Sequence, residues 1–290
     1  MVIAAPAREV ERASSTHWRY REDIAPRFDP VVFDERALAA RGLLAGAAGA
    51  GRGNTHFLVL DGHSLVLRHY RRGGLARRFS ERHYLWSGLE RTRAVREFEL
   101  LRELEAEGLP VPAPYACAVT RRGALWHGSL VTRRLPGRTL AEAVRGTGDV
   151  ETGGGPATPS EDAGASLPPE TWAAVGRTVA RFHAAGVRHA DLNAHNLLVE
   201  NGAPPGREPR VHLLDFDRAT RRVAPSGRIV RWQRDNLARL ARSLAKLART
   251  DGRAFDASGF AALERAWAES LRGSGADVAF SDRRRRPPRS

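Results

Sequence analysis

The chain has 290 residues, which is enough for one two-lobed domain or two small domains with a substantial core. Its single cysteine, Cys117, cannot form an internal disulfide, so the fold requires no oxidising compartment. The first dozen residues mix acidic and basic side chains without an apolar signal core, and the most lipid-like stretch, residues 42–51, is too short to span a bilayer. We therefore expect a cytoplasmic protein that is soluble or peripheral to a membrane.

The net charge of +14 and the isoelectric point near 11.3 permit three classes of partner: nucleic acid, an anionic membrane surface, or a phosphorylated substrate. Of the 47 basic residues only Lys246 is a lysine, which together with the high alanine and glycine content suggests the codon bias of a GC-rich genome. Charge alone therefore does not choose among the three classes.

The first segment, residues 1–45, has weak hydrophobic periodicity, and we expect an N-terminal extension with one short helix between Asp34 and Gly42. A glycine-rich turn follows at residues 46–53 and includes Gly51 and Gly53. Its backbone N–H groups could hold the phosphates of a nucleotide. The spacing is not G-x-G-x-x-G, however, and a flexible connector is the other interpretation.

Two apolar runs within residues 57–67 are joined around Asp61-Gly62, and this pattern predicts a β-hairpin. Residues 90–107 predict a helix, because apolar side chains recur on one side of it and Gly108 with the following prolines ends it.

Further along, residues 128–132 predict a strand, and residues 146–169 are so poor in large apolar side chains that we expect a mobile insertion. A helix is predicted from Pro169 to just before Gly186. His183 lies beside its apolar stripe, which favours a packing role for this histidine over a ligand role.

The most informative stretch is His189-Ala-Asp191-Leu-Asn193-Ala-His-Asn196, followed by a short apolar run and Asp215-Phe216-Asp217. Protein kinases use a loop H-R-D-x-x-x-x-N, whose Asp accepts the proton of the attacking hydroxyl and whose Asn binds Mg²⁺. Asp191 and Asn196 keep that spacing. The second metal-binding Asp should follow a neighbouring strand, and Asp215 follows the strand-like run 211–214. An isolated Asp-Leu-Asn is commonly a turn, so the argument rests on the two loops occurring together.

Four further positions bear on the likeness to the kinase pattern. Asn193 stands where kinases often place a lysine; it could bond the transferring phosphoryl group but cannot neutralise its charge, which leaves that task to an arginine. Asp217 replaces the glycine of Asp-Phe-Gly, and no Ala-Pro-Glu follows, which argues against a regulated protein kinase. Kinases also pair a strand lysine with a helix glutamate, and here Arg68 and Glu97 are the candidates for that pair. Arginine is not equivalent to lysine, and two unrelated surface charges are the alternative.

The C-terminal part contains two predicted helices, residues 232–249 and 256–271. The first alternates leucines with basic residues, which is typical of a helix with one solvated face and also of a helix on a membrane surface. Residues 276–290 end in a run of arginines, and we expect a basic disordered tail.

The motifs above resemble the Kdo (3-deoxy-D-manno-octulosonic acid) kinases of the lipopolysaccharide kinase group, which belong to the protein-kinase-like superfamily. The most specific match joins Arg68-His-Tyr-Arg-Arg-Gly-Gly74 to the Asp191-Leu-Asn-Ala-His-Asn196 loop. The resemblance covers about residues 45–145 and 170–250. It implies an α+β fold of two lobes, a small β-rich N-lobe at residues 46–132 and a mainly helical C-lobe at residues 133–275.

The resemblance also implies an ATP- and Mg²⁺-dependent enzyme that phosphorylates the 4-hydroxyl of Kdo on a lipid A precursor, at the cytoplasmic face of the inner membrane of a Gram-negative bacterium. On this interpretation Asp191 and Asn193 are catalytic, Asn196 and Asp215 bind the metal, and Gly51, Gly53, Arg68 and Glu97 bind the nucleotide. The candidates for docking the anionic acceptor or the membrane surface are four clustered arginines: Arg71, Arg72, Arg77 and Arg78. An ordinary basic loop is the alternative.

Two other functions remain open from the residues. The first is a kinase for a heptose or another small molecule such as an aminoglycoside, although a cationic acceptor fits these arginines poorly. The second is a basic pseudokinase that binds membrane or nucleic acid, which should have lost a base or metal-binding residue, yet Asp191, Asn196 and Asp215 are all present. We expect no nucleic-acid partner and no obligate protein partner.

Overall fold

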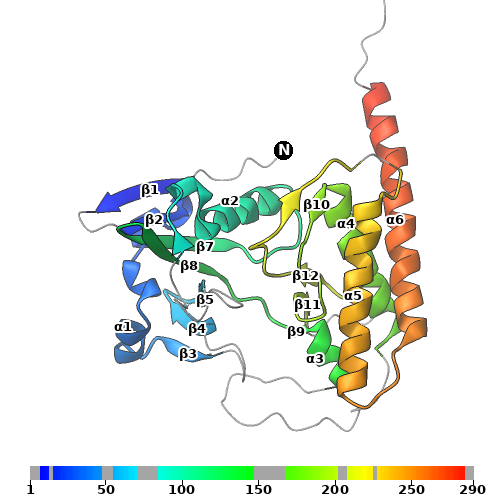
Figure 1. Ribbon diagram of the computed structural model, residues 1–290, viewed down its shortest axis with the longest axis horizontal. Coiled ribbons are helices and arrows are strands. Elements are labelled where there is room, and N and C mark those ends of the chain that lie inside the picture. Colours follow the sequence, from blue (N-terminus) through cyan, green and yellow to red (C-terminus); the bar gives the residue numbers. More distant parts are fainter. Residues whose placement is uncertain are drawn as a thin grey trace, which may run out of the picture. The chain divides into compact units, whose positions relative to one another are not determined.

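The structure is a computed structural model that describes residues 7–12, 16–47, 55–70, 84–146, 167–201, 208–224 and 227–284. The chain divides into two compact units, residues 1–135 and 136–290, each of which is described by itself (Figure 1). The first unit is a sheet with one long helix and the second is mainly helical, so the expected α+β class with a β-rich first part is confirmed.

An antiparallel sheet forms the first unit, in the order β1-β2-β7-β8-β5-β4-β3, with the short β6 paired to β8. Its strands are β1 (Ala7–Arg12), β2 (Thr16–Arg21), β3 (Leu44–Ala47), β4 (Thr55–Leu60), β5 (His63–His69), β6 (Tyr84–Leu85), β7 (Pro114–Arg122) and β8 (Leu125–Arg133). The predicted hairpin is confirmed as β4–β5. Asp61 and Gly62 form its turn with φ of 49° and 75°, the left-handed pair that a tight hairpin requires.

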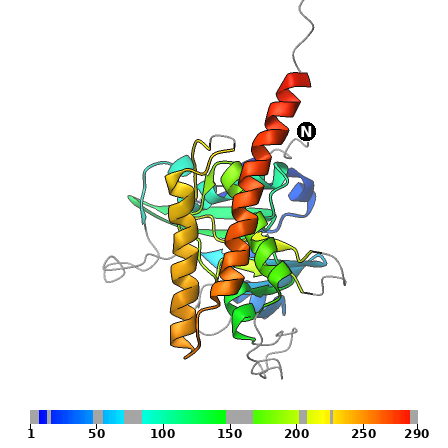
Figure 2. The ribbon, with the colours of Figure 1, turned by 90° about the vertical axis from the view of Figure 1, so that its right-hand side faces the viewer.

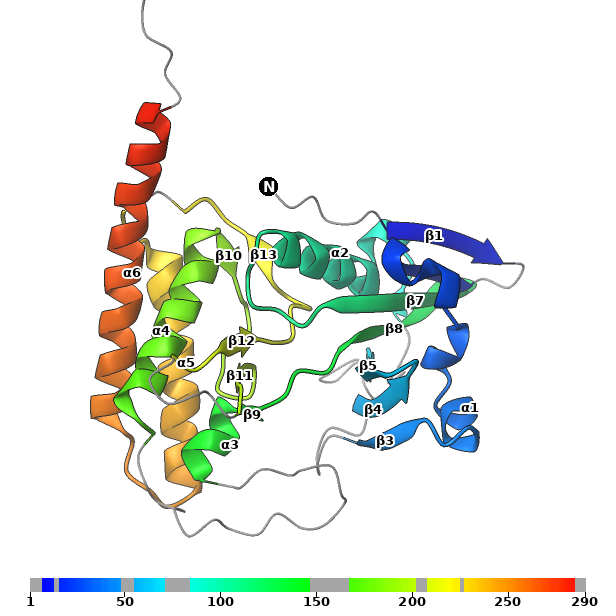
Figure 3. The same cartoon turned by 180° about the vertical axis from the view of Figure 1, so that it is seen from behind.

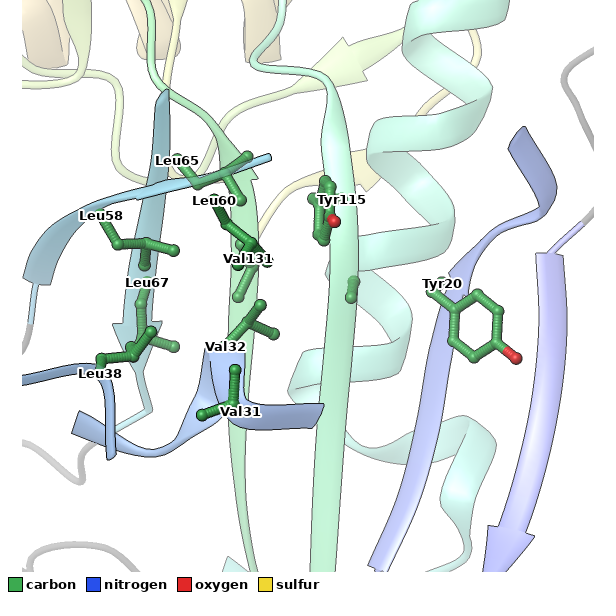
Figure 4. Packing of buried hydrophobic residues seen from close by; sticks show 11 residues of the cluster. Tyr20, Val31, Val32, Leu38, Leu58, Leu60, Leu65, Leu67, Tyr115 and Val131 are labelled. Atoms are coloured by element: carbon green, nitrogen blue, oxygen red, sulfur yellow. The ribbon is translucent and has the colours of Figure 1, made fainter. Parts of the chain in front are cut away.

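The two faces of this sheet have different roles, because side chains alternate along each strand. In β5, Leu65 and Leu67 point to one face, where they are fully buried against Val32 and Leu38 (Figure 4). Arg68 directly follows Leu67 in the strand and therefore points to the other face. The helix α2 covers that second face.

Helix α2 spans Arg93–Ala106 and buries Val95, Phe98, Leu101 and Leu104, as the periodicity predicts. It begins three residues later than expected, because residues 89–91 form a 3-10 turn. It ends at Ala106, two residues before Gly108, whose φ of 73° is a left-handed conformation that favours glycine. The helix is thus aligned along the sheet face that carries Arg68.

The segment expected as an N-terminal extension is part of the first unit. β2 pairs with β7, and two 3-10 turns (Glu22–Arg27 and Pro30–Phe33) with α1 (Glu35–Ala40) cover the core. Tyr20 faces this core while its neighbours Arg19 and Arg21 bind Glu99 and Glu105 of α2 at 3.2 and 2.7 Å. In β2 only Tyr20 is buried and the other side chains are partly exposed, so the strand shows little alternation in the sequence. The short helix that begins after Asp34 is confirmed, with Asp34 as its N-cap.

The second unit contains α3 (Leu140–Arg145), α4 (Pro169–Ala184), α5 (Arg231–Thr250) and α6 (Ala257–Arg284). Short strands connect them: β9 (Arg138–Thr139), β10 (Val187–Arg188), β11 (Leu197–Val199), β12 (Val211–Leu213) and β13 (Thr220–Arg221). β11 pairs with both β12 and β9, and β10 pairs with β13. The long helices α5 and α6 form one side of this unit (Figure 2).

Helix α6 differs from the expectation at the C-terminus, because it continues through Arg284 where a disordered tail was expected from residue 276. Its first half packs along α4 (Figure 3). Gly176 of α4 makes this approach possible, since a Cβ there would lie 2.2 Å from the carbonyl oxygen of Leu263. The run of alanine and other small residues that continues past Leu271 has no helix-stopping proline before residue 287.

Several sequence predictions lie outside the described residues. These are Gly51 and Gly53 of the glycine-rich turn, residues 147–166 of the expected insertion, the arginines 71, 72, 77 and 78, and the last six residues. Among the helices that the structure describes, none is long and apolar enough to cross a membrane.

The close contact between α4 and α6 generates a prediction. We expect Gly176→Ala to lower the free energy of unfolding by about 1–3 kcal/mol, because the new methyl group overlaps the backbone of Leu263. The matched control is Gly273→Ala in α6, where nothing lies within 4 Å of the added carbon. That change should be neutral or stabilise by up to about 1 kcal/mol. Urea unfolding of the two variants compares them, and equal midpoints would contradict the packing.

Candidate active site

The loop that carries Asp191 is held by helix α5. Asn236 accepts the backbone N–H of His189 at Oδ1 (3.3 Å) and donates from Nδ2 to the carbonyl of the same residue (2.6 Å). About two helical turns further along α5, the Ser243 hydroxyl accepts the N–H of Ala194 at 3.2 Å. These bonds lie on either side of Asp191 in the chain, so α5 fixes the loop at both ends.

The Asn236 amide also binds a buried histidine, and this sets the protonation of that histidine. Nε2 of His183 lies 3.1 Å from Oδ1 of Asn236, while the Trp267 indole donates to Nδ1 of His183 at 2.9 Å. Because an indole N–H can only donate, Nδ1 is unprotonated and Nε2 carries the hydrogen. Burial lowers the pKa of His183 to about 4. His183 is therefore a neutral packing residue, as the sequence predicts.

His189 joins the two candidate loops. Its Nε2 donates to the carbonyl oxygen of Leu214 at 2.9 Å, and its ring meets that of Phe216 edge-on, with centroids 5.2 Å apart. Burial lowers the pKa of His189, which favours this neutral form. Phe216 is itself buried against Phe182 of α4. The residue between these two contacts is Asp215, so its backbone is held on both sides.

Asp191 is placed at the surface by bonds within its loop. Asn196 and Asn193 donate from their amide nitrogens to the backbone carbonyl of Asp191, at 2.9 and 3.0 Å. The carboxylate of Asp191 is 56% exposed, and Nη1 of Arg239 lies 3.5 Å from its Oδ1. A solvent-facing carboxylate on a rigid turn is suited to accept a proton from an incoming hydroxyl group.

The Asn193 side chain bonds within the loop of Asp191. Both ends of its amide bond the loop, because Nδ2 donates to Asp191 and Oδ1 accepts the N–H of His195 at 2.8 Å. This is the local backbone bonding that asparagine favours in turns. In the structure the Asn193 side chain shapes the loop, and its expected role toward a phosphoryl group stays a prediction.

Asn196 and Asp215 lie at the same end of a small hairpin. Leu197 of β11 pairs with Leu213 of β12, and the N–H of Leu214 donates to the carbonyl of Asn196 at 2.8 Å. Asn196 therefore directly precedes one strand and Asp215 follows just beyond the other. Asp215 has a φ of 64°, a left-handed conformation that aspartate tolerates better than most side chains.

The donor chemistry at this end of the hairpin fits a magnesium ion bound together with a nucleotide. Asn196 donates its amide nitrogen to Asp191, so the atom that remains for a cation is the amide oxygen. Carboxylate and amide oxygens are hard ligands, and Mg²⁺ in phosphoryl-transfer sites takes one or two carboxylates plus phosphate oxygens. The part of the chain that the structure describes contains no group of three or more His, Cys, Asp or Glu side chains arranged for a metal.

In the first unit the structure brings Arg68 and Glu97 together. Nη2 of Arg68 lies 2.5 Å from each carboxylate oxygen of Glu97, and the Tyr70 hydroxyl donates to Glu97 at 2.6 Å. Burial, with the Glu97 charge, raises the pKa of Tyr70 well above its usual value and keeps this hydroxyl protonated. Glu97 is buried, whereas the Arg68 side chain is 25% exposed. The glutamate thus holds a guanidinium whose outer edge still reaches solvent.

Sequence reasoning did not identify three residues of α5 that contact the loop: Asn236, Arg239 and Ser243. The signal was present, because Asn236 is buried with the leucines of α5 and Ser243 lies seven residues later on the same side. A buried asparagine on a helix requires hydrogen-bond partners from another segment. The sequence does not say which segment supplies them.

Comparisons with known proteins identify the family of this chain. A family described as "Lipopolysaccharide kinase (Kdo/WaaP) family" matches residues 45–260. A 3-deoxy-D-manno-octulosonic acid kinase of Xanthomonas campestris pv. campestris (strain B100) is 41% identical over 230 residues, covering 79% of this chain and 78% of that one. The protein of the same description from Xanthomonas euvesicatoria pv. vesicatoria (strain 85-10) is 40% identical over 250 residues, 86% of each chain. Among solved structures, WaaP in complex with acyl carrier protein is 20% identical with a TM-score of 0.48, covering 85% of this chain and 89% of that one.

The buried neutral His183 predicts how stability depends on pH. Its pKa is about 4 in the folded protein and 6.5 as the ordinary value, so between these pH values the unfolded chain binds a proton that the folded chain does not. The free energy of unfolding should fall as pH falls from 6.5 to 4, by about 1.4 kcal/mol per pH unit for this group. We expect His183→Gln to lose this contribution. Urea unfolding of both proteins across the pH range measures it, and equal slopes would contradict the assignment.

Proposed function

We propose that this chain, which belongs to the lipopolysaccharide kinase (Kdo/WaaP) family, is an ATP-dependent kinase that phosphorylates Kdo. The observation that carries the proposal is the hairpin that places Asn196 and Asp215 at one end, beside the loop of Asp191. A pseudokinase that only binds membrane or nucleic acid is not favoured, because all three polar residues are present and held.

In the reaction, the acceptor hydroxyl oxygen forms a bond to the γ-phosphorus of ATP, and the bond from this phosphorus to the β,γ-bridging oxygen breaks. The electron pair of that bond leaves with ADP. Asp191 orients the hydroxyl group and accepts its proton. The bonds from Asn236, Ser243 and Asn196 hold the Asp191 backbone in place, which lowers the entropic cost of aligning the acceptor.

We assign the nucleotide-binding roles in the same way. Asn196 and Asp215 would hold Mg²⁺, which when bound neutralises charge on the phosphates. Arg68, held by Glu97, would bind the α- and β-phosphates as the strand lysine does in kinases. Arginine can make two parallel bonds to a phosphate, and it stays charged at any physiological pH.

For the acceptor, we propose the 4-hydroxyl of a Kdo sugar on a lipid A precursor, in the assembly of the lipopolysaccharide core. The support is the name shared by the two Xanthomonas relatives and an arginine-rich chain suited to a sugar carboxylate and lipid phosphates. A heptose of the same glycolipid is the second candidate acceptor.

The direct test is phosphorylation of purified Kdo-lipid A precursor, with ATP and Mg²⁺, followed by mass spectrometry. We expect one added phosphate on Kdo. Asp191→Asn should lower turnover by at least about 10²-fold, because the proton has no acceptor, while nucleotide binding persists.

Two outcomes would contradict parts of the proposal. Comparable turnover by Asp191→Asn would remove Asp191 from its role. A protein that binds Mg²⁺-ATP but leaves Kdo unmodified would exclude the Kdo acceptor and favour the heptose. Fragmentation of the product locates the phosphate on the sugar ring, and a position other than O4 would correct the site of transfer.

We also propose that the protein acts as a peripheral protein at the cytoplasmic face of the inner membrane. The support is the exposed face of α5, which carries the basic residues Arg231, Arg234, Arg242, Lys246 and Arg249 (the α5 basic stripe). Asp235 is the one acidic residue on α5, and it lies 3.7 Å from Arg231. A row of cations along a helix of 20 residues suits the phosphates of anionic lipids.

Vesicle binding tests this surface. We expect the double variant Arg242→Gln/Lys246→Gln to bind phosphatidylglycerol-containing vesicles on the order of 30-fold more weakly, since each cation near such a surface contributes about 1 kcal/mol. The matched control, Arg265→Gln/Arg272→Gln, removes two exposed charges from α6 and should bind like the wild type. Equal weakening in the two double variants would show that net charge, and not α5, governs binding.

A further inference from the structure

Arg239 of α5 is held beside the catalytic loop by its neighbours on the helix. Asn236 binds His189 and Ser243 binds Ala194, so the side of α5 between these two positions faces the segment that contains Asp191. Arg239 lies three residues after Asn236 and four before Ser243, and its Nη1 lies 3.5 Å from Oδ1 of Asp191. Its place next to the proton acceptor thus follows from the bonds of Asn236 and Ser243 and does not depend on the surface pair itself.

The charges around the loop of Asp191 explain why a nearby arginine matters for the reaction. The segment from Ala190 to Asn196 contains no lysine or arginine, and Asn193 bonds the loop with both ends of its amide. His189 is buried, and its ring is bonded to the backbone of Leu214. Phosphoryl transfer spreads negative charge over the oxygens of the moving group, next to the carboxylate of Asp191. A cation is therefore needed beside Asp191. Among the residues that the structure describes, Arg239 is the cationic side chain that reaches it.

The Arg239 side chain can also reach a ligand. It is 50% exposed, and its distance of 3.5 Å from Asp191 is longer than the 2.7–2.9 Å of a strong charged hydrogen bond. The guanidinium has five N–H donors in a planar fork, so contact with Asp191 leaves donors for a phosphoryl oxygen.

We propose that Arg239 is a catalytic residue that bonds the transferred phosphoryl group and neutralises the charge that develops on it. This inference rests on the proposed kinase activity, and it names the arginine that supplies the charge which Asn193 cannot. Helix α5 then contributes both the support of the catalytic loop and the cation that acts beside it.

The test compares Arg239→Ala, Arg239→Lys and a control, Arg265→Ala, an exposed arginine of α6. For Arg239→Ala we expect kcat to fall about 10²–10³-fold with the KM for ATP and for the acceptor changed by no more than about threefold. Arg239→Lys should recover part of kcat, and added guanidinium should raise the turnover of Arg239→Ala. The control should stay within about twofold of the wild type. Circular dichroism checks that each variant is folded.

Three results would overturn the proposal. The first is a kcat for Arg239→Ala within threefold of the wild type. The second is a raised acceptor KM with unchanged kcat, which would mean that Arg239 binds an anionic group of the acceptor. The third is a loss of kcat that neither lysine nor guanidinium relieves, which would mean that Arg239 only positions Asp191.

A second assay separates this inference from the proposed acceptor. Hydrolysis of Mg²⁺-ATP without any sugar transfers the same phosphoryl group to water. If wild type leaves Kdo unmodified but Arg239→Ala still lowers ATP hydrolysis by the expected factor, the acceptor is wrong and the role of Arg239 stands. If Kdo is phosphorylated equally well by both proteins, the enzyme function stands and the role of Arg239 fails.

Discussion

The candidate active site depends on one buried amide, the side chain of Asn236. Its oxygen accepts from the His189 backbone and from His183, and its nitrogen donates to the His189 carbonyl. Each of these groups lies in the interior, where a polar atom without a partner costs about 1–3 kcal/mol. Through His183 and Trp267 the same network includes α4 and α6. Three helices and the loop of Asp191 therefore share one set of hydrogen bonds, and a shift of any member breaks bonds of another.

The register in which the strands pair determines where the remaining polar groups of the candidate site lie. The contacts of those polar side chains contribute less. Asn196 and Asp215 come together because the strands that follow and precede them pair as an antiparallel hairpin. Arg68 faces Glu97 because Leu65 and Leu67 occupy the opposite, core-facing side of β5. A shift of one residue in either register would turn these functional side chains to the wrong face. The apolar residues of these strands thus determine where the polar ones point.

Features encoded locally could be predicted from the sequence. The β4–β5 turn, the caps of α1 and α2, and the spacing of Asp191, Asn196 and Asp215 each follow from a few neighbouring residues. Features that depend on distant partners could not. β2 joins the sheet through β7, about a hundred residues away, and Asn236 finds His189 across 47 residues. The bonds of Asn193 could not be predicted for a different reason, because a turn asparagine and a ligand-binding asparagine look alike in a sequence.

The presence of Arg68 beside Glu97 also determines which chemical labels can react with this protein. A guanidinium remains protonated and is a poor nucleophile, whereas the amine of a strand lysine can be acylated. The one lysine of the chain, Lys246, lies on the exposed face of α5. Nucleotide probes that tag kinases by acylating the strand lysine have no amine at Arg68 to react with. Labelling at this strand position would therefore not detect the protein, however active it was.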